Sequence, residues 1–146
     1  PELEVPVEIV DTLESTGHRV STFHRLEDGI HDVDIVYVTR TQEERFPSQD
    51  DADRYLGLFR LNEAIYTQNC KPNTVIMHPL PRDSRAQAQE LDDDLNQNPN
   101  LAIFRQADNG VLVRMALFAL VLDVVEEVDN HAQPVTWYTA KRHEQF

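Results

Sequence analysis

Residues 74–84 read "TVIMHPLPRDS", and the change of character inside this stretch decides the fold that we predict. The segment TVIM is mostly apolar without alternation, which is typical of a strand covered on both faces in a parallel sheet. The prolines at 79 and 81 cannot donate to a sheet ladder, so the strand must end before them. The Leu80–Pro81 bond is a candidate for a cis peptide, with an ordinary proline turn as the default.

The same strand pattern recurs in DIVYV, residues 34–38. A short strand is predicted at HRVSTF (18–23), and LAIF (101–104) is either a last strand or an extended approach to a helix. Strands that alternate with helices predict an α/β fold with a three-layer, Rossmann-like parallel sheet and helices on both faces. The predicted helices cover residues 5–16, 26–30, 48–56, 62–68, 85–95 and 111–128.

Capping residues indicate where several of these helices begin or end. Gly17 ends the first helix, Ser48 with an aspartate three residues later begins the third, and Asn62 begins the fourth. Asp108 or Asn109 caps the last helix, which is apolar nearly all round. That pattern predicts a helix buried against more than one other element.

Composition limits the possible partners of the chain. The 146 residues are enough for one domain with a real core, and the net charge is −13. A surface this acidic repels nucleic acids and anionic membranes, so we expect neither as a partner. An ordinary solvated surface explains the charge, and adaptation to high salt is the alternative.

Cysteine and histidine point to no metal site and to no disulfide. Cys70 is the single cysteine, which cannot form an internal disulfide and favours a reducing cytoplasm. The six histidines are scattered, so we expect no bound metal and no cofactor. The most apolar stretch, residues 115–122, is far shorter than the ~20 residues of a membrane span.

Two predicted strand ends carry candidate binding residues, since ligands of parallel sheets lie at the carboxyl ends of the strands. After the strand at 34–38, Arg40 and Gln42 point the same way if the chain is extended. A guanidinium fork suits a carboxylate, and Glu43 or Glu44 can hold Arg40 in position. A surface cluster of salt bridges is the alternative.

The other strand end is the proline turn. A fixed turn presents backbone carbonyls rigidly, and a carbonyl accepts a hydrogen bond from a substrate amide. His78 either donates to a ligand or satisfies buried backbone groups. A turn without any ligand remains the alternative from the residues alone.

Three motifs taken together resemble one enzyme family. VTRTQEERF, VIMHPLPR and FRQADNGVLVRMALFALVL occur in this order at residues 38–46, 75–82 and 104–122. They are similar to the C-terminal, aspartate-binding half of the aspartate carbamoyltransferases, and the resemblance covers residues 1–122. The related ornithine enzymes carry a cysteine where this chain has Pro79, which favours aspartate.

The resemblance implies a reaction and a set of site residues. The family joins the amino group of L-aspartate to the carbamoyl group of carbamoyl phosphate in de novo pyrimidine biosynthesis, without a metal. By motif match, Arg40 and Gln42 bind aspartate, and Glu44 positions Arg40. Leu80 and Pro81 offer backbone carbonyls to the carbamoyl group, with Pro81 cis. His78, Pro79 and Arg82 support the turn.

The resemblance also implies what this sequence lacks. The phosphate clamp of the family lies in an N-terminal carbamoyl-phosphate domain, and two further strands of the aspartate domain precede residue 1. We therefore expect an incomplete domain at 1–129, followed by a polar tail at 130–146, and no activity from this segment alone. Family members are homotrimers, and where they commonly continue the turn with Val-Asp-Glu, this chain has Asp83-Ser84-Arg85.

Other functions remain open at this point. A non-catalytic, amino-acid-binding relative would share the same residues, and so would a carbamoyltransferase for another amine acceptor. A nicotinamide-binding half-domain is disfavoured, because no G-x-G-x-x-G follows any predicted strand.

Overall fold

The computed structural model describes residues 3–128 and 130–131. The chain divides into two compact units, residues 1–108 and residues 109–146. The polar tail predicted at 130–146 lies outside the described residues except for 130–131.

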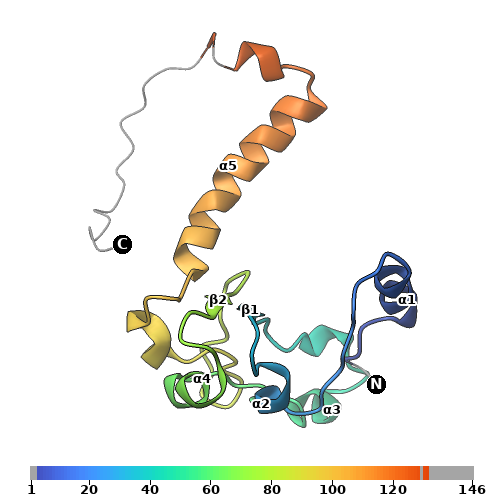
Figure 1. The fold of residues 1–146 in the computed structure, drawn as a ribbon, viewed down its shortest axis with the longest axis vertical. Coiled ribbons are helices and arrows are strands. Elements are labelled where there is room, and N and C mark those ends of the chain that lie inside the picture. Colours follow the sequence, from blue (N-terminus) through green and yellow to red (C-terminus); the bar gives the residue numbers. More distant parts are fainter. Residues whose placement is uncertain (1–2, 129, 132–146) are drawn as a thin grey trace. The chain divides into compact units, whose positions relative to one another are not determined.

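The first unit contains a parallel sheet of two strands, β1 (Ile35–Tyr37) and β2 (Val75–Met77) (Figure 1). The strands pair with Val36 opposite Ile76. The Val38 N–H donates to the Met77 carbonyl at 2.9 Å, and a parallel bridge joins Ile76 to Leu101. The two strands are therefore neighbours with their carboxyl ends at one edge, which confirms the predicted parallel α/β arrangement.

The helices begin largely where the capping residues indicated. The Ser48 side chain accepts from the Asp51 N–H at 3.2 Å, and the Asn62 side chain accepts from the Ile65 N–H at 2.8 Å. Gly17 follows the first helix with φ +89°, a conformation that glycine adopts without steric cost. The helices are α1 (Val7–Ser15), α2 (Leu26–Gly29), α3 (Gln49–Asp53), α4 (Glu63–Asn69) and α5 (Ile103–Val121). Short 3₁₀ turns are η1 (Glu43–Arg45), η2 (Asp93–Gln97) and η3 (Val125–Glu127).

The core of the first unit gathers around β2. Its fully buried large apolar side chains are Leu61, Ile76, Leu91, Leu95 and Ile103. The Tyr66 hydroxyl donates to the Thr74 carbonyl at 2.7 Å, and the Thr74 hydroxyl donates to the Val33 carbonyl at 2.7 Å. These contacts hold both strands against α4, so the loops that leave the strands start from a well-packed base.

The strand predicted at 18–23 is absent from the described structure, and that prediction is wrong. A strand exists only where a partner supplies its hydrogen bonds, and no described residue pairs with this segment. The neighbouring strand β1 is also covered less than expected, because Ile35 and Tyr37 are more than half exposed while Val36 is buried.

The prediction of a helix at 85–95 is also wrong, because residues 85–92 form turns and loop and a 3₁₀ turn begins at Asp93. Tertiary contacts hold this segment instead: Leu91 bridges to Leu61, and Arg60 makes a fork with Asp92 at 2.5 and 2.9 Å. Arg60 also donates to the Gln89 side chain at 3.2 Å. These side-chain bonds, with the loop hydrogen bonds around them, override the helical spacing of the leucines.

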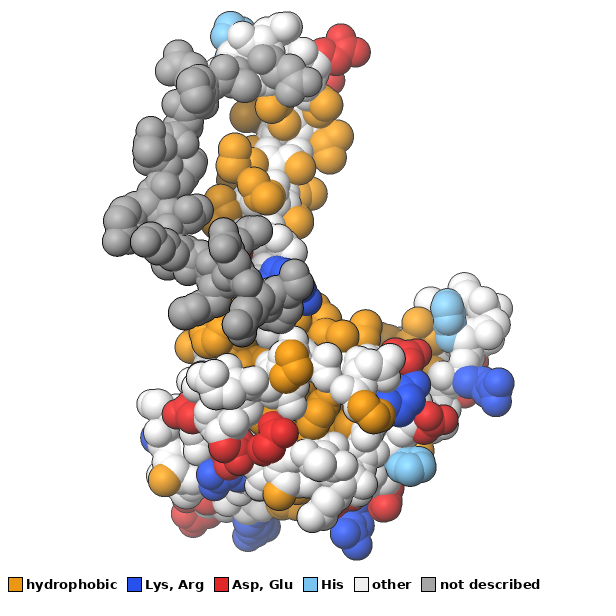
Figure 2. Space-filling model, turned by 60° about the vertical axis from the view of Figure 1, so that its left-hand side comes forward, with side chains coloured by type: hydrophobic (Ala, Val, Ile, Leu, Met, Phe, Trp, Pro, Cys, Tyr) orange, Lys and Arg blue, Asp and Glu red, His pale blue; other side chains and the backbone are white. Residues whose placement is uncertain are grey.

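The last helix, α5, begins earlier than predicted and ends earlier. It starts at Ile103, so Asp108 and Asn109 lie inside it rather than at its cap. Hydrophobic side chains cover the visible face of the helix (Figure 2), and those of Leu112, Phe118 and Val121 are 65%, 65% and 80% exposed. The expected burial against several elements is therefore not present among the described residues.

No helix within residues 3–128 and 130–131 combines the length and apolar character that a bilayer crossing requires.

Candidate functional site

The two loops predicted to carry the site do leave the same edge of the sheet. Arg40 and Gln42 follow β1, and the proline turn at 78–82 follows β2. Since β1 and β2 are adjacent and parallel, both loops emerge side by side. This is where a ligand of a parallel sheet is expected.

Arg40 is held by Glu44. Its Nη2 donates to Glu44 Oε1 at 2.7 Å and its Nη1 donates to Oε2 at 3.2 Å, while Nη1 also donates to the Thr41 carbonyl at 3.2 Å. The bond to Arg40 lowers the pKa of the Glu44 carboxyl, and the same bond raises the pKa of the guanidinium. The ion pair expected between these two residues is confirmed.

The guanidinium of Arg40 keeps donors for a ligand. Of its five N–H groups, those on Nη1 and one on Nη2 bind Glu44 and Thr41. The Nε–H and the second Nη2–H donate to no described residue, and together they form one side of the guanidinium fork. That side has the geometry that binds a carboxylate through two parallel hydrogen bonds.

The Leu80–Pro81 peptide bond is cis, as predicted. Leu80 has φ +53°, a conformation that few residues other than glycine adopt and that often marks a functional turn. Neither the Leu80 carbonyl nor the Pro81 carbonyl accepts a backbone hydrogen bond from the described residues. Both carbonyls are therefore available as acceptors.

A buried histidine and a buried carboxylate hold this turn through hydrogen bonds to its backbone. His78 is 1% exposed and Glu90 is 4% exposed. The Leu80 N–H donates to His78 Nδ1 at 2.8 Å, so the ring hydrogen must sit on Nε2, which donates to Glu90 Oε1 at 2.7 Å. Glu90 also accepts from the Asp83 N–H at 3.2 and 3.3 Å. His78 therefore supports the turn, and it does so in its neutral form.

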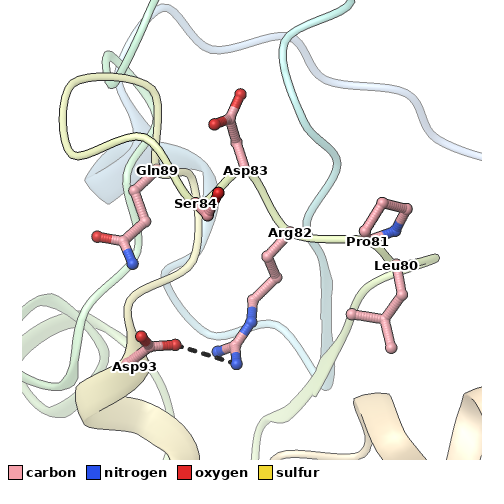
Figure 3. A pocket seen from close by; sticks show the side chains of 7 residues that line it. All are labelled: Leu80, Pro81, Arg82, Asp83, Ser84, Gln89 and Asp93. Atoms are coloured by element: carbon pink, nitrogen blue, oxygen red, sulfur yellow. Dashed lines mark ion pairs between the residues drawn. The ribbon is translucent and has the colours of Figure 1, made fainter.

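Arg82 lines a cavity next to the proline turn. The cavity, of about 570 Å³, is lined by Leu80, Pro81, Arg82, Asp83, Ser84, Gln89 and Asp93 (Figure 3). Within it, Arg82 Nη2 pairs with Asp93 Oδ1 at 3.0 Å, and Arg82 Nη1 donates to the Asn96 side chain at 3.0 Å. Arg40 and Gln42 do not line this cavity, so the structure places the two halves of the predicted site at one edge but not around one closed pocket.

An arginine that the sequence interpretation did not single out joins the two loops. Arg85 pairs with Glu43 from the first loop and with Asp83 from the second. Arg40 also lies near enough to Asp83 to help lower the pKa of that carboxyl, although Arg85 is the main cause. Charged contacts therefore connect the loop of Arg40 with the loop of the proline turn.

Sequence reasoning missed Glu90, Arg85 and Gln106. Gln106 Oε1 accepts from the His78 N–H at 3.0 Å, and its Nε2 donates to the Tyr37 hydroxyl at 3.0 Å. A glutamate or glutamine among many gives no local signal. The one available hint was that a buried histidine after a strand needs a partner for each ring nitrogen.

The described residues contain no group of three or more His, Cys, Asp or Glu side chains placed to hold a metal ion.

Comparison with known proteins shows which family the chain belongs to. Residues 1–121 match the family model of the aspartate/ornithine carbamoyltransferase, Asp/Orn binding domain. The chain is 65% identical over 140 residues to an aspartate carbamoyltransferase catalytic subunit of Saccharophagus degradans. It is 45% identical over 143 residues to the subunit of the same name in Dichelobacter nodosus.

Solved structures show the same fold. The catalytic subunit of M. jannaschii aspartate transcarbamoylase is 30% identical, with a TM-score of 0.67 over 86% of this chain and 38% of that chain. Aspartate transcarbamoylase from Trypanosoma cruzi, in complex with carbamoyl phosphate and aspartate, is 28% identical. Its TM-score is 0.66 over 80% of this chain and 37% of that chain.

The match covers most of this chain but only part of its relatives. It takes in 96% of this chain and 42% of the Saccharophagus degradans subunit, and 98% and 41% for the Dichelobacter nodosus subunit. These matches, together with the parallel sheet, the cis Leu80–Pro81 turn and Arg40 at the same sheet edge, lead to one conclusion. The chain belongs to the aspartate/ornithine carbamoyltransferase family and carries its Asp/Orn-binding domain.

Proposed function

We propose that this chain is the aspartate-binding part of a carbamoyltransferase that transfers the carbamoyl group of carbamoyl phosphate to the amino group of L-aspartate in de novo pyrimidine biosynthesis. One observation carries the proposal. The loop after β1 holds Arg40, which has one side of its guanidinium fork free for a ligand, and the turn after the adjacent parallel strand β2 holds the free carbonyls of Leu80 and Pro81. The relatives named aspartate carbamoyltransferase, and the Trypanosoma cruzi structure with both substrates, support the choice of substrates.

In this proposal the chain binds and orients both substrates. Arg40 takes a carboxylate of aspartate through its Nε and Nη2 hydrogens, and Gln42 hydrogen-bonds beside it. The Leu80 and Pro81 carbonyls accept from the carbamoyl NH₂ group. Glu44 positions Arg40, while His78, Pro79 and Arg82 keep the turn in place.

The reaction itself needs little covalent chemistry from these residues. The amine lone pair of aspartate attacks the carbamoyl carbon, the bond from that carbon to the phosphate oxygen breaks, and the amine loses a proton. Holding the amine and the carbamoyl carbon in line lowers the barrier through orientation. Carbonyls aimed at the carbamoyl NH₂ help to stabilise the tetrahedral species.

The proposal extends to partners and location. Residues 1–129 act with an N-terminal carbamoyl-phosphate domain that supplies the phosphate contacts, and residues 130–146 form a tail. A homotrimer in the cytoplasm is the assembly that we propose. In the described part of the chain, no contact bears on the trimer.

Arg40→Ala in the complete polypeptide that carries this sequence tests the function. We expect the wild type to form N-carbamoyl-aspartate from aspartate and to leave ornithine unreacted. Losing the bidentate contact should lower kcat/KM for aspartate by a factor on the order of a hundred or more. The readout is product formation at varied aspartate concentration.

Arg54→Ala is the matched control, because the Arg54 side chain is 75% exposed and pairs with the neighbouring Asp51 at 3.4 Å. It should leave kcat/KM unchanged. A wild type that carbamoylates ornithine, or an Arg40→Ala variant with normal kinetics for aspartate, would refute the proposal. Residues 1–146 alone should show no transfer.

A further inference from the structure

We infer that Arg85 is a positioning residue that couples the aspartate-binding loop to the proline turn by bridging Glu43 and Asp83. The inference rests on the proposed function and adds a residue that sets affinity for one of the two substrates.

The bridge consists of several hydrogen bonds from one side chain. Arg85 Nη2 donates to Asp83 Oδ2 at 2.6 Å and its Nε donates to Asp83 Oδ1 at 3.1 Å. On the other side, Arg85 Nη1 donates to Glu43 Oε2 at 3.4 Å, and Nη2 forms a closer contact with Glu43 Oε1. One guanidinium therefore holds two carboxylates that come from different loops.

Each carboxylate of the bridge is anchored on its own side. Glu43 Oε2 accepts from the Gln49 side chain at 2.8 Å, which fixes Glu43 to α3. The Asp83 N–H donates to the buried Glu90, which also binds His78 and so reaches the N–H of Leu80. The bridge is thus the link between an anchored loop and an anchored turn.

The position of Glu43 gives this link its effect. Glu43 follows Gln42 directly and precedes Glu44, the residue that holds Arg40. Fixing Glu43 to the turn therefore restrains the backbone directly after Gln42 and directly before Glu44, the residue that holds Arg40. Loss of Arg85 should let this loop move relative to the Leu80 and Pro81 carbonyls.

The charge of Arg85 is a second reason to expect weaker binding of aspartate when this residue is lost. The ion pairs of Arg40 and Arg85 involve three carboxylates, on Glu43, Glu44 and Asp83. Without Arg85, the carboxylates of Glu43 and Asp83 lose this cation, and their negative charge repels a dicarboxylate substrate more strongly. The Leu80 and Pro81 carbonyls, which are proposed to bind the carbamoyl group, depend instead on the buried contact between His78 and Glu90. That contact does not involve Arg85.

Arg85→Ala therefore should raise the KM for aspartate roughly three- to tenfold, while the KM for carbamoyl phosphate stays within twofold. Arg85→Lys, which keeps the charge, should recover part of the loss. Glu43→Gln should raise the aspartate KM as well, and the double variant Glu43→Gln/Arg85→Ala should be no worse than Arg85→Ala alone. Arg54→Ala serves as the control for loss of a surface arginine.

Several outcomes overturn the inference in an active enzyme. They are an unchanged aspartate KM in Arg85→Ala, equal rises in both KM values, and additive effects of the two single substitutions. Equal rises would show general damage rather than coupling, and additive effects would show that Glu43 and Arg85 act separately.

A measurement that needs no turnover separates this inference from the proposed function. An inactive wild type would refute the proposed function. Amide hydrogen exchange would still show whether Arg85 couples the two loops. Arg85→Ala should speed exchange at residues 41–46 and leave β2 unchanged. Unchanged exchange at 41–46 would overturn the coupling whatever the activity.

Discussion

The loops after β1 and β2 leave the same sheet edge but are held in opposite ways. The turn after β2 rests on His78 and Glu90, which are 1% and 4% exposed and bound to each other and to the backbone. The loop after β1 carries the ion pair of Arg40 and Glu44, whose side chains are 43% and 59% exposed. A buried network fixes backbone carbonyls independently of salt, whereas an exposed ion pair leaves a guanidinium accessible to an incoming carboxylate.

Removing the buried carboxylate should have the largest effect on stability. Glu90→Ala leaves the His78 Nε2–H and the Asp83 N–H without an acceptor in a place that water barely reaches. We expect the free energy of unfolding to fall by about 2–6 kcal/mol, since each of the two buried unsatisfied donors costs roughly 1–3 kcal/mol. Urea unfolding measures the change.

Glu14→Ala is the control for this prediction, because Glu14 is an exposed carboxylate in α1. A Glu90→Ala variant that unfolds at the same urea concentration as Glu14→Ala would show that the turn does not depend on its buried support.

The packing of residues 85–92 can be tested at Gly57. A Cβ at Gly57 would lie 2.9 Å from the Gln87 carbonyl oxygen, whereas a Cβ at Gly17 would meet nothing within 4 Å. Both glycines have positive φ, so Gly57→Ala and Gly17→Ala share a strain of about 1–2 kcal/mol. Gly57→Ala should cost roughly 1–3 kcal/mol more because of the clash, as in overpacked cores.

Unfolding of the two alanine variants side by side gives the difference directly. Equal losses of stability would mean that the segment around Gln87 yields freely, and that the turn after β2 is less rigidly held than we describe.

The ion bridge between the loops predicts a pH dependence. Arg85 is the main cause that lowers the pKa of the Glu43 carboxyl below its usual value of 4.5, and also that of the Asp83 carboxyl. A carboxyl with a lowered pKa in the folded state stabilises the fold above the unfolded pKa, and this contribution disappears as the pH falls through the lowered value. Arg85→Ala should raise the pKa of both carboxyls.

Carbon NMR titration of the Glu43 and Asp83 carboxyls measures these changes, with the Glu14 carboxyl as an internal reference. The bridge is absent in solution if Arg85→Ala leaves both titration curves in place.

The smallest effect on stability is expected from the exposed pair. Glu44→Ala removes one partner of the Arg40–Glu44 contact, but both groups stay in water and are screened by salt. The urea midpoint should stay at the wild-type value, while binding of aspartate weakens because Arg40 is less well oriented. A stability loss as large as that of Glu90→Ala would remove the distinction between the two loops.

Local patterns in the sequence predicted the features that depend on few neighbouring residues. The caps at Ser48 and Asn62 and the stop of β2 at the proline turn were correct, since each depends on residues close by along the chain. The helix predicted at 85–95 failed because Arg60 and Leu61 hold that segment from a distant part of the chain. Apolar spacing alone could not reveal that competition.

By itself, the sequence determined the two parallel strand cores, the proline turn and the motif that puts Arg40 beside Glu44, because the residues within each feature lie close along the chain. Only the tertiary structure decided that 18–23 pairs with no described strand, that Glu90 accepts from His78, and that Arg85 reaches Glu43 across 42 positions. The physical reason is that backbone sterics, capping and turn formation act between neighbours in sequence. Strand pairing, burial and ion pairing depend instead on which distant segments the folded chain brings together.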